Sequence, residues 1–151
     1  MNRHPLSSAE ESSVVQIIRK ALLVILAIGL GGTLMELLLL EHTDGFWQIV
    51  PVVLLGLGLL ALGAHVALRR SVGILRSFQA MMTSYVLSGL TGVFLHYSGN
   101  VEFEVERDSA LAGFDLFREA MMGATPALAP GAMVQLGLIG LAYTLRHPLT
   151  R

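Results

Sequence analysis

The chain of 151 residues contains no cysteine. This absence excludes disulfide bonds, iron–sulfur ligation, covalently attached c-type haem and catalysis by a thiol. Charge is also scarce, at 14% of residues with a net charge of −1, so the chain has no basic surface that would recruit nucleic acid. Phosphate-binding loops and the nucleophile signature of Ser-His-Asp enzymes are missing too, so we expect no catalytic residues and no enzyme.

Apolar side chains dominate what is present. Hydrophobic residues make up 54% of the sequence, and the mean hydropathy is +0.67. These values are too apolar for an ordinary soluble domain, and the chain is too short for two domains with separate cores. We therefore expect one membrane domain that covers residues 1–151.

Four apolar runs are long enough to be transmembrane helices. The first, Ala21–Leu40, has twenty residues and a single charge, at Glu36. A helix of that length rises about 30 Å, which is the thickness of the hydrocarbon core of a bilayer. Comparable runs cover residues 48–68, 77–96 and 127–145. The sequence therefore predicts an all-α membrane protein built as a bundle of four transmembrane helices.

The remaining residues form two tails and one outer segment in this arrangement. Residues 1–20 are expected to be a cytoplasmic tail with a short lead-in, and residues 146–151 a second cytoplasmic tail. The first apolar run is longer than a signal-peptide core of about 7–15 residues and lacks a small-x-small cleavage site, so we expect it to be retained. Residues 97–126 are expected to be an extracytoplasmic segment.

The charges divide between the two sides of the predicted bundle. Eight of the ten basic residues fall on the side of the termini: Arg3, Arg19, Lys20, Arg69, Arg70, Arg76, Arg146 and Arg151. Eight of the eleven acidic residues fall on the opposite side: Glu41, Asp44, Glu102, Glu104, Glu106, Asp108, Asp115 and Glu119. By the positive-inside rule, both termini are predicted to be cytoplasmic and residues 97–126 to face outward.

Two patterns occupy the outer segment. From Val101 to Glu106, apolar and acidic residues alternate with the period of two that is typical of a strand. After Asp108, apolar residues recur at helical spacing as far as Met121, which predicts an amphipathic helix lying on the membrane. The residues expected to contact a partner protein or lipid headgroups are Val101, Phe103, Val105, Phe114 and Phe117.

Glu36 is the candidate functional residue inside the first predicted span. A carboxylate at that depth costs about 2–3 kcal/mol on insertion scales, so it should face the bundle interior and find a donor or stay protonated. One interpretation is a proton relay, an ion site, or a contact to a headgroup or cofactor. The other is a hydrogen bond to a group such as Thr33, Tyr85 or Thr91 that serves the fold alone.

His42 and His96 lie at the outward ends of the first and third predicted spans, and Glu41 precedes His42. Such side chains suit a metal ion. No spacing such as HxxxH or ExxH is present, however, and interfacial histidines are commonly solvated. We therefore predict no metal site, with Glu41, His42 and His96 as the candidates if one exists.

A haem b held by two histidines would suit a small membrane bundle. His65 lies near the inner end of its predicted span, so most of the membrane separates it from His96. His42 and His96 match in depth but lie near water. We therefore predict no cofactor, with haem b or a quinone near Glu36, His42 and His96 as the alternative.

Four phrases of the sequence carry a resemblance: ELLLLEHTD at 36–44, LHYSGNVEFE at 95–104, GATPALAPG at 123–131 and AYTLRHP at 142–148. In these phrases the chain resembles a family of small uncharacterised bacterial integral membrane proteins with four spans. The resemblance covers all four predicted spans and implies the cytoplasmic (inner) membrane of a bacterium. It implies no activity, cofactor or catalytic residue.

We expect a non-enzymatic accessory or scaffold subunit of a larger membrane complex, because no set of catalytic groups converges and the outer segment exposes apolar residues. Its expected partners are the lipid bilayer and other membrane subunits or a second copy of the chain, without nucleic acid. One alternative is a small proton- or ion-coupled transporter that uses Glu36 with the polar residues of 77–96. Another is a membrane redox protein that binds haem or a quinone.

Overall fold

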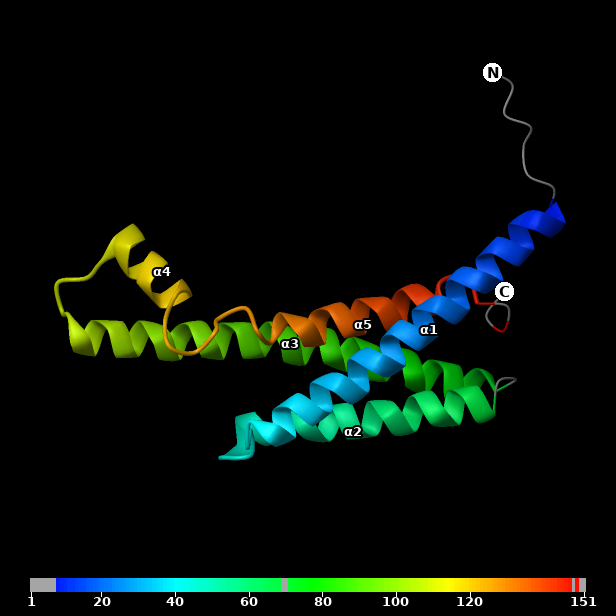
Figure 1. Ribbon diagram of the computed structural model, residues 1–151, viewed down its shortest axis with the longest axis horizontal. Coiled ribbons are helices and arrows are strands. Elements are labelled where there is room, and N and C mark those ends of the chain that lie inside the picture. Colours follow the sequence, from blue (N-terminus) through cyan, green and yellow to red (C-terminus); the bar gives the residue numbers. More distant parts are fainter. Residues whose placement is uncertain (1–7, 69–70, 148, 150–151) are drawn as a thin grey trace, which may run out of the picture.

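The computed structural model describes residues 8–68, 71–147 and 149, with only the backbone described for residues 8–12. Within these residues the chain forms helices and no strand, which agrees with the expected all-α class. The helices are α1 (Ser8–Leu39), α2 (Phe46–Ala67), α3 (Val72–Arg107), α4 (Gly113–Met121) and α5 (Gly131–Thr144). They are labelled in Figure 1.

Three of these helices are long and apolar enough to cross a membrane, namely Ser13–Leu39 of α1, α2 and α3. This length and composition indicate a membrane protein. A fourth full-length span over 127–145 is not confirmed, because α5 has 14 residues and rises only about 21 Å. Pro126 and Pro130 explain its late start: residues 126–130 form successive turns, and Pro130 is the N-cap of α5.

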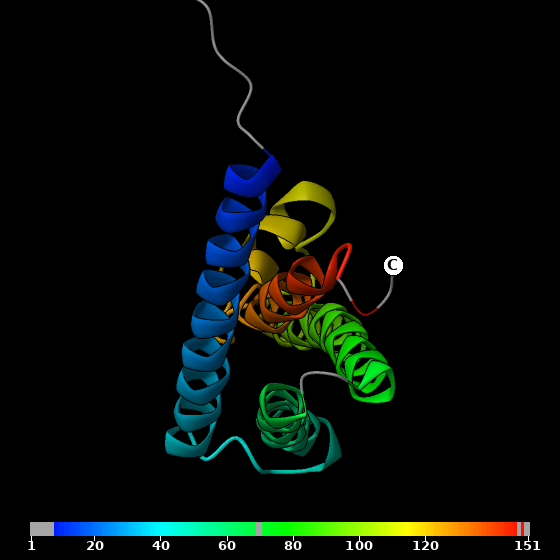
Figure 2. The same cartoon turned by 90° about the vertical axis from the view of Figure 1, so that its right-hand side faces the viewer.

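The helices α1, α2, α3 and α5 contact one another in a ring. α1 packs on α2 and α5, and α3 packs on the same two helices. Figure 1 shows α3 along most of the length of the molecule, with α5 beside one half of it and α4 near its other end. Viewed end-on in Figure 2, α1 crosses beside the group of α2, α3 and α5. α4 contacts α3.

The core of this ring is apolar and fully helical. Its buried cluster is formed by Leu26, Leu30, Leu55, Leu62, Phe78, Met82, Tyr85, Met133, Leu136 and Tyr143. Each of the four helices contributes to this cluster, so burial of these side chains holds the ring together. Tyr85 also donates a hydrogen bond from its Oη to the carbonyl oxygen of Leu54 at 2.8 Å, which joins α3 to α2.

α3 and α5 approach until their backbones nearly touch. A Cβ atom added at Gly137 would lie 2.6 Å from the carbonyl oxygen of Met82, and one added at Gly89 would lie 2.8 Å from the backbone nitrogen of Val134. Such distances leave no room for any larger side chain. Small residues therefore set the separation of these two helices, as is common in membrane bundles.

Arg19 joins the first helix to the end of the last. Its Nη2 donates to the carbonyl oxygen of Leu145 at 2.7 Å and to that of Arg146 at 3.0 Å. These carbonyls follow the C-terminus of α5, where a helix has acceptors that lack partners. The guanidinium therefore caps α5 from α1 and fixes these two ends side by side.

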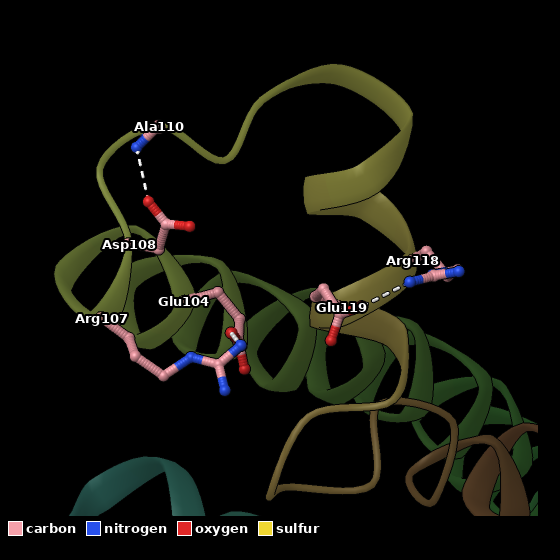
Figure 3. Close-up of polar contacts among 6 residues, drawn as sticks. All are labelled: Glu104, Arg107, Asp108, Ala110, Arg118 and Glu119. Atoms are coloured by element: carbon pink, nitrogen blue, oxygen red, sulfur yellow. Dashed lines mark hydrogen bonds and ion pairs between the residues drawn. The ribbon is translucent and has the colours of Figure 1, made fainter.

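The predicted strand at Val101–Glu106 is wrong, because α3 continues without a break to Arg107. A single strand would have had no partner for its backbone groups, whereas the helix satisfies them internally. Val101 is half-buried and Glu104 is 5% exposed. Figure 3 shows Glu104 paired with Arg107, at 2.6 Å between the carboxylate and the guanidinium.

The helix expected after Asp108 is present as α4, although it begins at Gly113. Asp108 instead shapes the connection, since its Oδ1 accepts a hydrogen bond from the backbone nitrogen of Ala110 at 2.9 Å (Figure 3). On α4 itself, Arg118 pairs with Glu119 at 2.8 Å.

Candidate ligand-binding cavity

A cavity of about 660 Å³ lies between the helices near the end of α1. Its walls come from the last turns of α1, the α1–α2 turn, the start of α2, the middle of α3, and the α4–α5 connection with the first turn of α5. Its polar lining consists of Thr33, Glu36, His42, Trp47, Gln48, Ser88, Thr91, His96 and Thr125. The remaining lining is mostly aliphatic side chains, proline and alanine. The volume is typical of cavities that hold small molecules, at about 300–1,000 Å³.

Glu36 reaches this cavity from α1. No side chain in the described part of the chain bonds or ion-pairs with its carboxylate. Tyr85, one of the donors considered for it, bonds Leu54 instead. Thr33 and Thr91 line the same cavity without a hydrogen bond to Glu36. Glu36 is exposed, so the prediction that it faces the bundle interior and finds a donor there is wrong. Its carboxylate lies at the rim of the cavity and does not hold two helices together.

His42 and His96 line the same cavity, and their ring centres lie 6.5 Å apart with a tilt of 55° between the planes. Nδ1 of His96 lies 3.1 Å from the carbonyl oxygen of Pro126. Because a carbonyl only accepts, Nδ1 carries the proton, and Nε2 of a neutral His96 is left as an acceptor. This bond also holds the α4–α5 connection against α3.

The pKa of His42 lies below its usual range. Partial burial is the main cause, because it disfavours the charged imidazolium, and repulsion from His96 adds to it. His42 is therefore neutral at pH 7. The titratable side chains that line the cavity are Glu36, His42 and His96. No lysine or arginine of the described residues joins them, so Glu36 is the lining side chain there that can carry a negative charge.

Glu41 stands apart from this group. It lies in the turn after α1 with a φ of 50° and is exposed, and it does not line the cavity. Among the described residues, no three His, Asp or Glu side chains gather closely enough to hold a metal ion. His65, the other histidine considered for haem, is 2% exposed and has its Nε2 2.7 Å from Tyr143 Oη, away from this cavity.

The residues expected at a partner or headgroup surface lie on α3 and α4. Phe114 is 75% exposed and Phe117 47% exposed, and their ring centres lie 6.1 Å apart. Phe103 and Val105 are exposed on α3, while Val101 is half-buried. Tyr97 packs beside Phe117 at 6.0 Å between ring centres. α4 therefore presents a partly exposed aromatic face.

Three residues that line the cavity are not predicted from the sequence, namely Trp47, Thr125 and Pro126. Trp47 has the position of an interfacial anchor, yet it lines the cavity next to Gln48. Thr125 and Pro126 reach it because Asn100 holds their loop: Nδ2 of Asn100 donates to the carbonyl oxygens of Ala120 at 2.8 Å and of Thr125 at 2.7 Å. The sequence around Asn100 gives no signal for this contact, which depends on the burial of the amide in the folded chain.

Comparison with family models, with curated proteins and with solved structures finds no match to this chain.

Proposed function

We propose that this chain is a four-span protein of the bacterial cytoplasmic membrane whose cavity binds an amphiphilic small molecule. The observation that carries the binding role is the unpaired carboxylate of Glu36 in a cavity of about 660 Å³. A carboxylate within a membrane helix is costly and is commonly functional. Aliphatic walls with a few polar groups suit a ligand that is mostly apolar and has one polar end.

The proposed topology uses α5 together with residues 127–130 as the fourth span. The contact of Arg19 with the end of α5 supports this, because it brings the basic ends of α1 and α5 together. The acidic end of α3, with α4, lies at the other end of the molecule (Figure 1). Both termini are then cytoplasmic and α4 is outside.

The chain contains no cysteine, so single cysteines can report the topology. Ser109→Cys and Leu68→Cys change exposed residues at opposite ends of the bundle. We expect a membrane-impermeant maleimide to label Ser109→Cys in intact spheroplasts, and Leu68→Cys only after the membrane is opened. Equal labelling of both variants in intact spheroplasts would contradict the four-span topology.

A neighbouring pair of substitutions tests the cavity. Thr91 lines it, whereas Leu90 is 57% exposed and does not line it. The chain is purified from its native membrane in mild detergent and its small-molecule content is measured by native mass spectrometry and absorption, which would also reveal haem or quinone. We expect a molecule bound to the wild type and to Leu90→Phe but lost from Thr91→Phe. Identical content in all three proteins would contradict a binding role for the cavity.

A second proposed function is that of an accessory subunit, supported by the partly exposed aromatic face of α4. Phe114 is 75% exposed, and Phe117 is 47% exposed with Tyr97 beside it. The test is the double variant Phe114→Ser/Phe117→Ser, purified in mild detergent beside the wild type. A stoichiometric partner protein lost only from the variant would support this role. A lone, monodisperse wild-type chain would count against it.

A further inference from the structure

We infer that the cavity selects a hydrophobic organic cation, such as a lipophilic amine or quaternary ammonium or phosphonium compound, with Glu36 as its counter-ion. This inference rests on the binding role proposed above and specifies the class of ligand. Three features carry it: the sign of the charge in the cavity, the indole of Trp47, and the number of oxygen ligands.

The charge in the cavity comes from one group. Among the described residues Glu36 is the one acid that lines it, and no lysine or arginine does. His42 and His96 are the other ionisable groups there, and the pKa of His42 is lowered, so it carries no charge at pH 7. A bound cation would neutralise this exposed, unpaired carboxylate, whereas an anion would be repelled by it.

Trp47 adds a second preference for positive charge. It lines the cavity from the first turn of α2, and its ring lies edge-on to Phe46 at 5.2 Å between centres. The face of an indole attracts a cation, and tryptophan does so best among the aromatic residues. Recognition of quaternary ammonium groups by aromatic rings follows the same chemistry.

The lining disfavours an inorganic cation. Ca²⁺ takes about 6–8 oxygen ligands and Mg²⁺ requires an octahedron, but the cavity supplies a single carboxylate with scattered hydroxyl and amide groups. The described residues contain no three-ligand cluster. Apolar walls formed by residues such as Leu37, Val50 and Met133 instead favour a cation that is itself apolar.

Tetraphenylphosphonium and tetraphenylborate test this inference, because they share size and shape and differ in the sign of charge. The full chain is placed in lipid nanodiscs, binding is measured by equilibrium dialysis against empty nanodiscs, and Trp47 fluorescence gives a second signal, since Trp47 is the single tryptophan. We expect saturable binding of the phosphonium to the wild type and no saturable binding of the borate.

Glu36→Gln removes the charge and keeps the shape, and we expect it to weaken phosphonium binding at least about tenfold. Glu41→Gln is the matched control, because it makes the same change on an acid that does not line the cavity, and it should bind as the wild type. Glu36→Asp keeps the charge and should keep most of the affinity. This comparison with the wild type remains available if Glu36→Gln does not fold.

The outcomes separate the two proposals. Binding of tetraphenylborate that equals or exceeds that of the phosphonium, and that is lost in Thr91→Phe, would overturn the cation preference and leave the cavity a binding site. Phosphonium binding unchanged in Glu36→Gln would overturn the role of Glu36. If neither probe binds more weakly to Thr91→Phe than to Leu90→Phe, the binding role itself fails.

Discussion

Asn100 of α3 holds Thr125 of the α4–α5 connection with both ends of its amide. Its Nδ2 donates to the carbonyl oxygen of Thr125 at 2.7 Å, and its Oδ1 accepts from the backbone nitrogen of Thr125 at 3.3 Å. The side chain is 4% exposed, and a Cβ added at Gly123 would lie 2.6 Å from its Cγ. The side-chain amide of Asn100 thus bonds the backbone N–H and C=O of Thr125 and holds this loop against α3.

Asn100→Leu should therefore destabilise the protein and open the cavity wall. The carbonyl oxygens of Ala120 and Thr125 lose their donor, and a buried polar group left without a partner costs about 1–3 kcal/mol. We expect a lower free energy of unfolding and faster labelling of a cysteine placed at Thr125. Glu102→Leu, an exposed change on the same helix, is the control. Unchanged stability in Asn100→Leu would contradict the described contact.

Gly137→Ala should be destabilising although alanine favours helices. The added Cβ would meet the carbonyl oxygen of Met82 at 2.6 Å, and overpacking costs about 1–3 kcal/mol. Gly63→Ala makes the same change where nothing lies within 4 Å, so it should gain up to about 1 kcal/mol from helix propensity. Thermal unfolding in detergent measures both. If the two variants shift the midpoint equally, α3 and α5 are not in the described contact.

His42 should make the protein less stable in acid. Its pKa in the folded state is lowered by burial and by His96, whereas in the unfolded chain it is about 6.5. Between these two values the unfolded chain binds more protons, so the free energy of unfolding rises with pH there and falls as pH drops below about 6.5.

The measurement is NMR titration of labelled histidine together with unfolding at several pH values. His96→Gln removes the repulsion, so the pKa of His42 should rise in this variant. His42→Gln should reduce the pH slope of stability. A His42 pKa at or above about 6.5 in the wild type would refute the explanation.

Arg19→Met should weaken the contact between α1 and the end of α5 and lower the free energy of unfolding. The carbonyls of Leu145 and Arg146 lose their donor, and hydrogen bonds to charged groups contribute about 1.5–3 kcal/mol. The same change should raise the pKa of His147, which burial lowers first and the charge of Arg19 lowers further. Unfolding and histidine NMR report the two effects. Lys20→Met, which removes an exposed charge one residue away, should leave both unchanged.

Length and hydropathy predict much of this fold. The runs at 21–40, 48–68 and 77–96 lie within α1, α2 and α3, with small differences at the ends, because a bilayer requires about twenty apolar residues of helix. The helical rise of about 1.5 Å per residue also predicts that His42 and His96 lie at a similar depth, near the outer ends of their spans. The structure places both residues, with Glu36, on one cavity. Their roles stay predictions.

The end of α3, the start of α5 and part of the cavity lining depend on tertiary contacts, which a local sequence pattern does not predict. The alternation after Val101 has the period of a strand, yet Asn100 and Glu104 find their partners on a helix. α5 is shorter than its apolar run because Pro130 delays its start. Trp47 and Thr125 line the cavity through tertiary packing, and neither position has a sequence signal for it.

The contact between Arg19 and the end of α5 also orders events during synthesis. Arg19 lies in α1, and one of its acceptors, the carbonyl oxygen of Leu145, lies 126 residues farther along the chain. During synthesis the guanidinium of Arg19 therefore lacks these acceptors until residues 145 and 146 have been made. A chain stopped before Leu145 would keep the apolar contacts between α1 and α5 but lack this polar bond, so only the completed chain joins the two helices at both levels.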